Sequence, residues 1–567
     1  MPNLRSIASD AGNGRSLPAK DDVIAVKHLW KAFYDRNQDS IVVAISDVSV
    51  NVKRGQFVCI CGPSGCGKST LIRILAGLED KTLGEIGIEP TRSGSERPPA
   101  MVFQEASLFP WLTIEENVAY PLRLQGASAE EREARTRELL EVTRLTDFAK
   151  SYPHQLSGGM KQRASVARAL VDNDSDILLM DEPFGALDEQ TRIELQQELL
   201  RIWEQTGKTV LFITHSVEEA VTLGDRVIVM SARPGEIVAD IKVPFPRPRD
   251  VLDLRRQPQF GQLIFDVWQL LARSKTKEQG ASPLTKETAD GIVSQPSSSP
   301  KPTASELERL SKPSWTERLV SVVGKFSPLL VLVLWELLTQ IGTVDARFFP
   351  SPSSIASVFW QELVDGTLLV DTLATLERVA IGFVAGGVPA IILGLVLGLW
   401  PTARQLIAPI FSALYPVPKI ATFPLLLLIL GVGEAPKYTI IAIVVFFLVF
   451  FNTLTGVRYA PRIYLDVAQN LGSSTLNTFR LIALPAALPS IFTGLRLGLG
   501  TGFVVIAAVE FVGARSGLGY AIWSSWQIFA VEKMYVNIIA ISLLGYLCIL
   551  LLEGIEYVSM PWSRGNR

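Results

Sequence analysis

The stretch Phe57–Thr70, FVCICGPSGCGKST, decides the fold of the first half of this chain. An apolar run leads into the pattern GxxxxGK[ST], and a helical pattern, LIRILAGL, follows. Glycines let the backbone N–H groups of such a loop point at phosphate oxygens, and the helix start adds its positive dipole end. Lys68 would place a charge near the β- and γ-phosphates, and Ser69 would offer a hydroxyl to Mg²⁺. The stretch therefore predicts a nucleotide-binding loop.

A second apolar run, Ile177–Met180, delivers two carboxylates, Asp181 and Glu182. Ligands bind at the carboxyl ends of parallel strands. Asp181 can hold the Mg²⁺ shell, and Glu182 can orient and deprotonate an attacking water. Alone, the pattern also fits a solvated loop, but beside a phosphate loop it predicts ATP hydrolysis. Strand-like and helix-like patterns alternate between residues 22 and 273, which indicates an α/β domain.

A third stretch, LSGGMKQR at 156–163, precedes a helix-forming run. Ser157 and the glycine N–H groups suit an anion at a helix start. A common helix cap is the alternative reading of the same residues.

Charge is distributed unevenly along the chain. The net charge of the 567 residues is −2, which argues against nucleic acid as a partner. Of the 54 + 56 = 110 charged residues, 26 fall in residues 320–567, where long apolar runs lie. Because a span needs about 20 apolar residues, this half is predicted to cross a lipid bilayer. Six candidate spans are 326–342, 379–400, 405–431, 438–457, 486–512 and 535–556, the third interrupted by Pro416 and Pro418.

The chain is thus predicted to be a multidomain protein, an α/β P-loop domain followed by an all-α polytopic membrane domain. The expected segments are a disordered N-terminus at 1–21, the ATPase domain at 22–273, a flexible linker at 274–312 and the membrane domain at 313–567. Lys and Arg flank the spans on one side, which places both termini and the ATPase domain in the cytoplasm.

The first half resembles the ATP-binding cassette (ABC) transporter ATPases. This resemblance implies a Q-loop glutamine at Gln104, a switch histidine at His215 and a signature motif at 157–160, with Met160 where many members have Gln. It implies an adenine-stacking aromatic at Phe33, with Tyr34 as the competing choice. The implied ATP-binding set is Phe33, Gly62, Pro63, Ser64, Gly65, Cys66, Gly67, Lys68, Ser69, Thr70, Gln104, Ser157, Gly158, Gly159, Asp181 and the D-loop residue Asp188. The implied catalytic set is Glu182, His215, Gln104 and Lys68, and the implied Mg²⁺ ligands are Ser69, Gln104 and Asp181.

The second half resembles the type I importer permeases with six helices. Asp466–Gly472, followed by Ile482–Pro485, fits the loop EAA–x3–G–x9–I–x–LP, with Asp466 and Val467 in place of the usual Glu and Ala. In that family the loop forms a coupling helix that docks on the ATPase near the Q-loop. Stretches such as TLERVAIGF at 375–383 resemble the nitrate/sulfonate/taurine group.

This resemblance implies an ATP-driven importer of a small anion such as nitrate, a sulfonate or taurine. Such a protein would work in the bacterial cytoplasmic membrane, pair with a second copy of itself, and take substrate from a separate extracytoplasmic binding protein. Two readings compete with it. An ABC exporter or flippase would lack the coupling-loop pattern, and a cassette ATPase acting on nucleic acid or ribosomes would lack the spans.

Charged residues inside spans are costly and often functional. Arg496 and Glu510 lie within the fifth candidate span, and Arg378 starts the second. A substrate role, snorkelling to the interface and helix-to-helix pairing are all open for these side chains. The sequence also leaves open the transported substrate, the identity of the binding protein, and pairing with a different permease.

Overall fold

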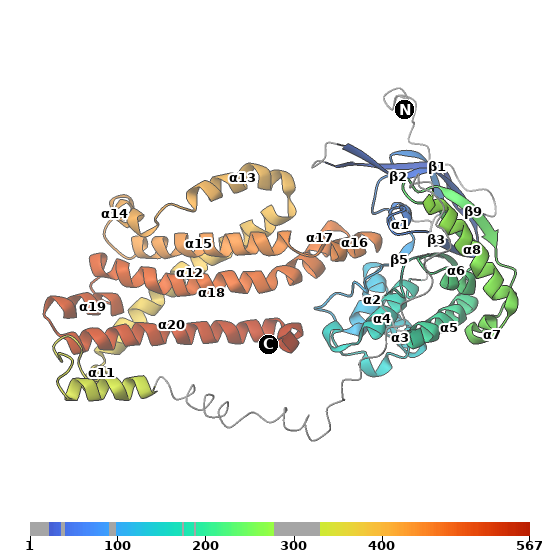
Figure 1. Ribbon diagram of the computed structural model, residues 1–567. Coiled ribbons are helices and arrows are strands. Elements are labelled where there is room, and N and C mark those ends of the chain that lie inside the picture. The colour runs from blue at the N-terminus through green and yellow to red at the C-terminus, as the bar shows by residue number, and fades with distance from the viewer. Residues whose placement is uncertain are drawn as a thin grey trace, which may run out of the picture. The chain divides into compact units, whose positions relative to one another are not determined.

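The computed structural model describes residues 22–35, 40–89, 98–172, 175–185, 189–276 and 329–566. They form two compact units, shown in Figure 1. The first unit consists of the described residues within Met1–Ser282, Ala460–Ala486 and Met560–Arg567. The second unit consists of the described residues within Pro283–Tyr459 and Ala487–Ser559. The predicted N-terminal segment 1–21 lies outside the described residues, and so does the predicted linker 274–312 apart from residues 274–276, which end α8 (Pro258–Thr276).

The first unit contains two sheets. An antiparallel sheet of three strands has the order β2-β1-β4, with β1 (Asp22–Asp35), β2 (Ser40–Lys53) and β4 (Leu83–Ile88). A six-stranded sheet has the order β5-β6-β7-β3-β8-β9, in which only the β8–β9 pair is antiparallel. Its strands are β3 (Phe57–Cys61), β5 (Ala100–Val102), β6 (Ile177–Asp181), β7 (Thr209–Thr214), β8 (Arg226–Met230) and β9 (Ile237–Lys242).

Every residue of β3, β6 and β7 is buried, as expected for central strands of a sheet covered on both faces. This confirms the predicted α/β domain. The helices of the unit are α1 (Lys68–Leu75), α2 (Ile114–Leu124), α3 (Ala129–Val142), α4 (Gly158–Leu170), α5 (Glu189–Thr206), α6 (Val217–Leu223), α7 (Val251–Arg255) and α8 (Pro258–Thr276).

A segment that belongs to the second half of the sequence completes the first unit. It contains α16 (Arg462–Asn470), α17 (Thr475–Thr478) and a π-helical turn, Phe479–Ala483. Val467, Ala468 and Ile482 are buried in the same hydrophobic cluster as the strands of the ATPase domain. We call Ala460–Ala486 the coupling segment.

The second unit is helical. Besides the apolar helix Leu329–Gln340, its helices are α11 (Pro352–Val364), α12 (Thr367–Leu399), α13 (Pro401–Leu414), α14 (Phe423–Leu430), α15 (Ala435–Arg458), α18 (Leu484–Gly513), α19 (Leu518–Gln527) and α20 (Val531–Ser559). Among the described residues, four helical stretches are long and apolar enough to cross a membrane: Thr367–Leu399, Ala435–Arg458, Thr475–Gly513 and Val531–Ser559.

These four correspond to the second, fourth, fifth and sixth candidate spans. The first candidate contains only the shorter helix Leu329–Gln340 within the described residues. The third, 405–431, is not a single helix, because α13 ends at Leu414 and α14 begins at Phe423. The interruption falls at Pro416 and Pro418, as the sequence indicates, since proline lacks the N–H that a helix needs.

Glycines bring α12, α15 and α18 into close contact, and Figure 1 shows α12 crossing behind the other two. A Cβ at Gly386 of α12 would lie 2.2 Å from the Ala442 carbonyl oxygen of α15. One at Gly494 of α18 would lie 2.8 Å from the Asn452 Cβ of α15. Small residues allow such backbone approach in membrane helices, so α15 is held tightly between its two neighbours.

Candidate functional site

The loop Gly62–Gly67 connects β3 to α1 and curls around the Lys68 side chain. Gly65 and Gly67 have φ angles of +76° and +94°, in the region that favours glycine. A Cβ at Gly67 would also lie 2.7 Å from the Ala44 carbonyl oxygen of β2. Lys68 Nζ donates to the carbonyl oxygens of Gly62 at 2.8 Å and Pro63 at 3.0 Å. The loop therefore has the predicted geometry of a phosphate cradle with a cation at its centre.

Ser69 and Asp181 meet beside this cradle. Ser69 Oγ donates to Asp181 Oδ1 at 3.1 Å, and Asp181 is buried at the end of β6. Burial raises the pKa of Asp181, and the hydrogen bond from Ser69 partly offsets this shift. A hydroxyl and a carboxylate, both predicted as Mg²⁺ ligands, thus lie next to each other.

Glu182, Gln104 and His215 converge on one point. Glu182 Oε2 lies 3.3 Å from Gln104 Nε2, which donates to it, and 3.3 Å from His215 Nδ1. The three residues follow β6, β5 and β7, and these strands are neighbours in the order β5-β6-β7. Parallel neighbours end at one edge of the sheet, so residues far apart in sequence come together there. Sequence reasoning named all three but could not predict their contact.

The backbone of Glu182 adds a feature that no sequence pattern indicated. Its φ is +44°, which is unfavourable for a residue with a side chain. Its N–H donates to the Ile213 carbonyl oxygen of β7 at 3.0 Å, which helps to hold this conformation. The carboxylate is thereby turned toward Gln104 and His215.

The remaining expected residues are placed separately. Ser157 is the N-cap of α4, and its hydroxyl accepts a hydrogen bond from the Met160 N–H at 3.4 Å. In a single copy of the chain, Ser157 therefore acts as a helix cap. Phe33 lies in β1 opposite Val42 and is 39% exposed. The Lys31 ammonium lies 4.6 Å from the centroid of the Phe33 ring. Tyr34 beside it is 61% exposed. Asp188 lies outside the described residues.

The coupling segment docks on the ATPase domain through polar contacts. Asn470, buried in α16, accepts from the Met101 N–H at 3.0 Å and donates to the Pro99 carbonyl oxygen at 2.9 Å. Arg73 pairs with Asp466 at 2.8 Å, and the Trp111 indole N–H donates to the Leu481 carbonyl oxygen at 2.8 Å. Met101 lies in β5, directly ahead of the loop that carries Gln104. The expected docking of this loop near Gln104 is therefore present in the structure.

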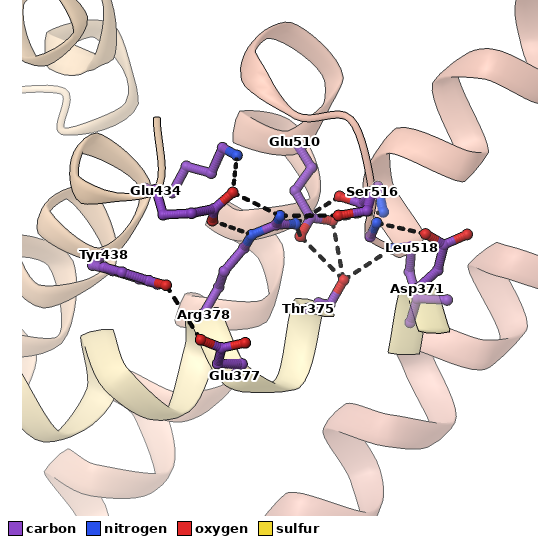
Figure 2. A network of polar contacts seen from close by, with 12 residues as sticks. Asp371, Thr375, Glu377, Arg378, Glu434, Tyr438, Glu510, Ser516 and Leu518 are labelled. Carbon is purple, nitrogen blue, oxygen red and sulfur yellow. Dashed lines mark hydrogen bonds and ion pairs between the residues drawn. The ribbon is translucent and has the colours of Figure 1, made fainter. Parts of the chain in front are cut away.

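The second unit contains a network of polar contacts around the buried side chains of Arg378 and Glu510, shown in Figure 2. Arg378 of α12 donates to Glu434 at 2.6 Å and 3.0 Å, to Glu510 of α18 at 2.7 Å, and to the Ser516 carbonyl oxygen at 2.6 Å. Glu510 is fully buried and also accepts from Thr375 and from the Gly519 N–H. We call Thr375, Arg378, Glu434, Glu510 and the turn 516–519 the Arg378 network.

Helix pairing also accounts for Arg496. Its guanidinium contacts Glu556 and lies 3.7 Å from Glu553, both on α20. Of the interpretations left open for Arg378, Arg496 and Glu510, the contacts favour pairing between helices for all three.

Comparison with known proteins assigns each half of the chain to a family. Residues 45–185 match the ABC transporter family. Residues 390–562 match the family described as binding-protein-dependent transport system inner membrane component. Fold, site and matches together define the class: a membrane transport protein that hydrolyses ATP, with ATPase and permease domains in one chain.

Several relatives of the first half are named as import ATP-binding proteins. The aliphatic sulfonates import ATP-binding protein SsuB of Bacillus cereus is 45% identical over 220 residues, covering 38% of this chain and 86% of that protein. The taurine import ATP-binding protein TauB of Roseobacter denitrificans is 40% identical, covering 44% and 94%. The nitrate import ATP-binding protein NrtD of Synechocystis sp. is 42% identical, covering 42% and 92%. The chain belongs to the ABC transporter family, as a binding-protein-dependent importer component.

A solved structure of a dimeric ATP-binding cassette, in a post-hydrolysis state with ADP and Pi, is 35% identical to this chain. It covers 39% of this chain and all of its own, with a TM-score of 0.36.

We expect Asn470→Ala to weaken docking of the coupling segment. The change leaves the Met101 N–H and the Pro99 carbonyl oxygen buried without their partner, which costs about 1–3 kcal/mol. The melting temperature of the purified protein should fall by about 2–6 °C. Gln469→Ala is the matched control, because Gln469 is exposed and makes one hydrogen bond, to the Gly77 carbonyl oxygen at 3.1 Å. Equal melting temperatures for the two variants would contradict this account.

Proposed function

We propose that this chain imports a small oxygen-bearing anion, such as a sulfonate, taurine or nitrate, with a separate extracytoplasmic binding protein. The observation that carries the proposal is the docked coupling segment, which joins the ATPase domain to a binding-protein-dependent permease. The substrate class rests on the names of relatives at 40–45% identity in the ATPase half. An exporter is disfavoured because the docked segment carries the importer loop pattern.

In this proposal the ATP site works through the residues gathered at the sheet edge. Lys68 neutralises the β- and γ-phosphates inside the glycine loop, and Glu182 takes a proton from the attacking water. Gln104 and His215, each 3.3 Å from Glu182, position that water and contact the γ-phosphate. Phe33 stacks on the adenine from its exposed place in β1.

Mg²⁺ would be held by Ser69, Asp181 and Gln104. Hard oxygen donors suit this ion, and the Ser69–Asp181 pair supplies two of them at 3.1 Å from each other. Among the described residues no cluster of three or more His, Cys, Asp or Glu side chains forms a separate metal site. This fits an ion that completes its shell with phosphate oxygens and waters. When bound, the ion would neutralise charge that develops on the transferred phosphate.

Two copies would be needed to complete the site. In the proposed homodimer, Ser157, Gly158 and Gly159 of one copy cap the γ-phosphate held by the other. Open space at Gly158, where an added Cβ would meet nothing within 4 Å, leaves the start of α4 free for this contact. The homodimer would lie in the bacterial cytoplasmic membrane with its ATPase domains and termini in the cytoplasm. Arg458, Arg462 and Arg480 around the coupling segment support that orientation.

The test is ATP-dependent uptake by intact cells that produce the chain and its binding protein. A labelled panel of nitrate, taurine, an alkanesulfonate and bicarbonate should give uptake of one compound, and Glu182→Gln should abolish it. A wild-type chain that hydrolyses ATP yet takes up none of the panel would refute the proposed substrate class.

A further inference from the structure

The interruption between α13 and α14 contains a lysine in the middle of a long apolar stretch. Residues 415–419 are not α-helical, and Pro416 and Pro418 within them have no N–H to donate. Lys419 follows directly, and it is the one charged residue of the sequence between Arg404 and Glu434. Sequence reasoning noted the prolines and missed the lysine, although its isolation in a long apolar run was visible.

Contacts with α15 give the depth of Lys419 along the helices. Its Nζ lies 4.8 Å from the ring centroid of Phe447 and 4.9 Å from that of Tyr415. Phe447 is residue 447 − 435 + 1 = 13 of the 24 residues of α15. At about 1.5 Å per residue, it lies about 18 Å from either end of that helix. Because α15 is long enough to cross a hydrocarbon core of about 30 Å, the Lys419 ammonium lies level with the middle of this candidate span, too far from either end to reach an interface by snorkelling.

This ammonium has no acidic partner within the described part of the chain. The ion pairs of the second unit there use other cations: Arg347 with Asp345, Arg378 and Lys437 with Glu434, Arg378 with Glu510, Arg496 with Glu553 and Glu556, and Lys533 with Glu362. Lys419 contacts two aromatic faces and donates to the Tyr415 carbonyl oxygen. A cation at mid-depth without a counter-ion is costly, and such residues mark ion and substrate pathways.

Within the described residues, the side of the interruption on which Lys419 lies is only partly covered by other helices. Tyr415, Val417 and Ile420 are 47%, 42% and 46% exposed. Irregular backbone at membrane depth is tolerated only where it is buried in protein or lines water, because hydrocarbon cannot satisfy its polar groups. The irregular backbone and the charge therefore make hydrocarbon an unfavourable neighbour for this side.

We propose that Lys419 is an anion-binding residue at the middle of a water-filled translocation path. Tyr415 and Phe447 hold the ammonium by cation–π contact, and its free N–H donors bind the oxygens of a sulfonate or nitrate during passage. This inference rests on the proposed function, since it names the residue that would make the path selective for an anion. Arg378 and Arg496, which are occupied by carboxylates, cannot serve in this way without breaking their pairs.

The first test compares uptake by wild type, Lys419→Met and Lys419→Arg, each with the binding protein. Uptake of the anion found with wild type should fall at least tenfold in Lys419→Met and be largely kept in Lys419→Arg. Lys533→Met is the matched control, because Lys533 already has Glu362 at 3.4 Å and lies outside the interruption. Basal ATP hydrolysis should stay unchanged in all variants. Uptake by Lys419→Met equal to wild type would overturn the inference, whereas no uptake by wild type would instead refute the proposed substrate class.

A second test does not depend on a stable Met variant. Lys419→Cys is made in a chain with Cys548→Ala, so that the other cysteines, Cys59, Cys61 and Cys66, are buried. A water-soluble cationic thiosulfonate reagent should react at Cys introduced at 419, restore a positive charge and recover uptake. The corresponding anionic reagent should react without recovery, and the Cys548→Ala chain alone should respond to neither. Absence of reaction with both reagents would show that position 419 does not face water and would overturn the inference.

Discussion

Replacing Glu182 with Gln should lower the rate of ATP hydrolysis by about 10²–10⁴-fold, the range that a general base contributes. The amide keeps the size and the contacts of the side chain but cannot accept the proton of the attacking water. Gln104 and His215 both lie 3.3 Å from the Glu182 carboxylate. Neither of these two side chains is a carboxylate, so neither can take over the role of Glu182 as the base. ATP binding should be preserved, because the cradle around Lys68 is unchanged.

Phosphate release from the purified protein measures this effect, and equilibrium binding of ATP measures the preserved step. Glu130→Gln is a suitable control, because Glu130 is an exposed residue in the first turn of α3. A rate for Glu182→Gln within tenfold of wild type would mean that another group deprotonates the water.

The second large effect is expected at the Arg378 network. Arg378→Met leaves the fully buried Glu510 carboxylate without its charge partner, and removal of one member of a buried pair costs about 3–5 kcal/mol. The melting temperature of the second unit should therefore fall by about 10 °C. Lys437 remains beside Glu434 at 2.8 Å, so Glu510 is the residue left uncompensated.

Two further variants separate this effect from a general loss of packing. The double variant Arg378→Met with Glu510→Met should recover part of the lost stability, because it removes the uncompensated charge. Arg347→Met removes an arginine whose pair with Asp345, at 2.9 Å, is exposed, and it should change the melting temperature little. A double variant less stable than Arg378→Met would argue that the network acts through packing and not through charge.

The ATP site was largely predictable, because its chemistry is concentrated in contiguous patterns. The glycine loop with Lys68 and the pair Asp181–Glu182 carry their roles in local sequence. The meeting of Glu182 with Gln104 and His215 was not predictable, since it depends on the strand order β5-β6-β7. The positive φ of Glu182 could not be predicted either, because the hydrogen bond to β7 that helps to hold it is a tertiary contact.

The membrane half was predictable in outline and less so in detail. The long apolar runs predicted the four helices that are long enough to span a membrane. Pro416 and Pro418 predicted the interruption of the third candidate span. The pairing of Arg378 with Glu510 joins residues 132 positions apart, and no local pattern specifies it. For the same reason the depth of Lys419 became visible only through its contact with Phe447.

The close glycine contacts of α15 with α12 and α18 have a mechanical consequence. The coupling segment lies in the chain between α15 and α18, so both helices are covalently linked to a segment that packs on the ATPase domain. Backbones that touch without intervening side chains, as at Gly386 and Gly494, leave no compressible layer between the helices. These three helices are therefore expected to move together as one rigid body whenever the coupling segment shifts.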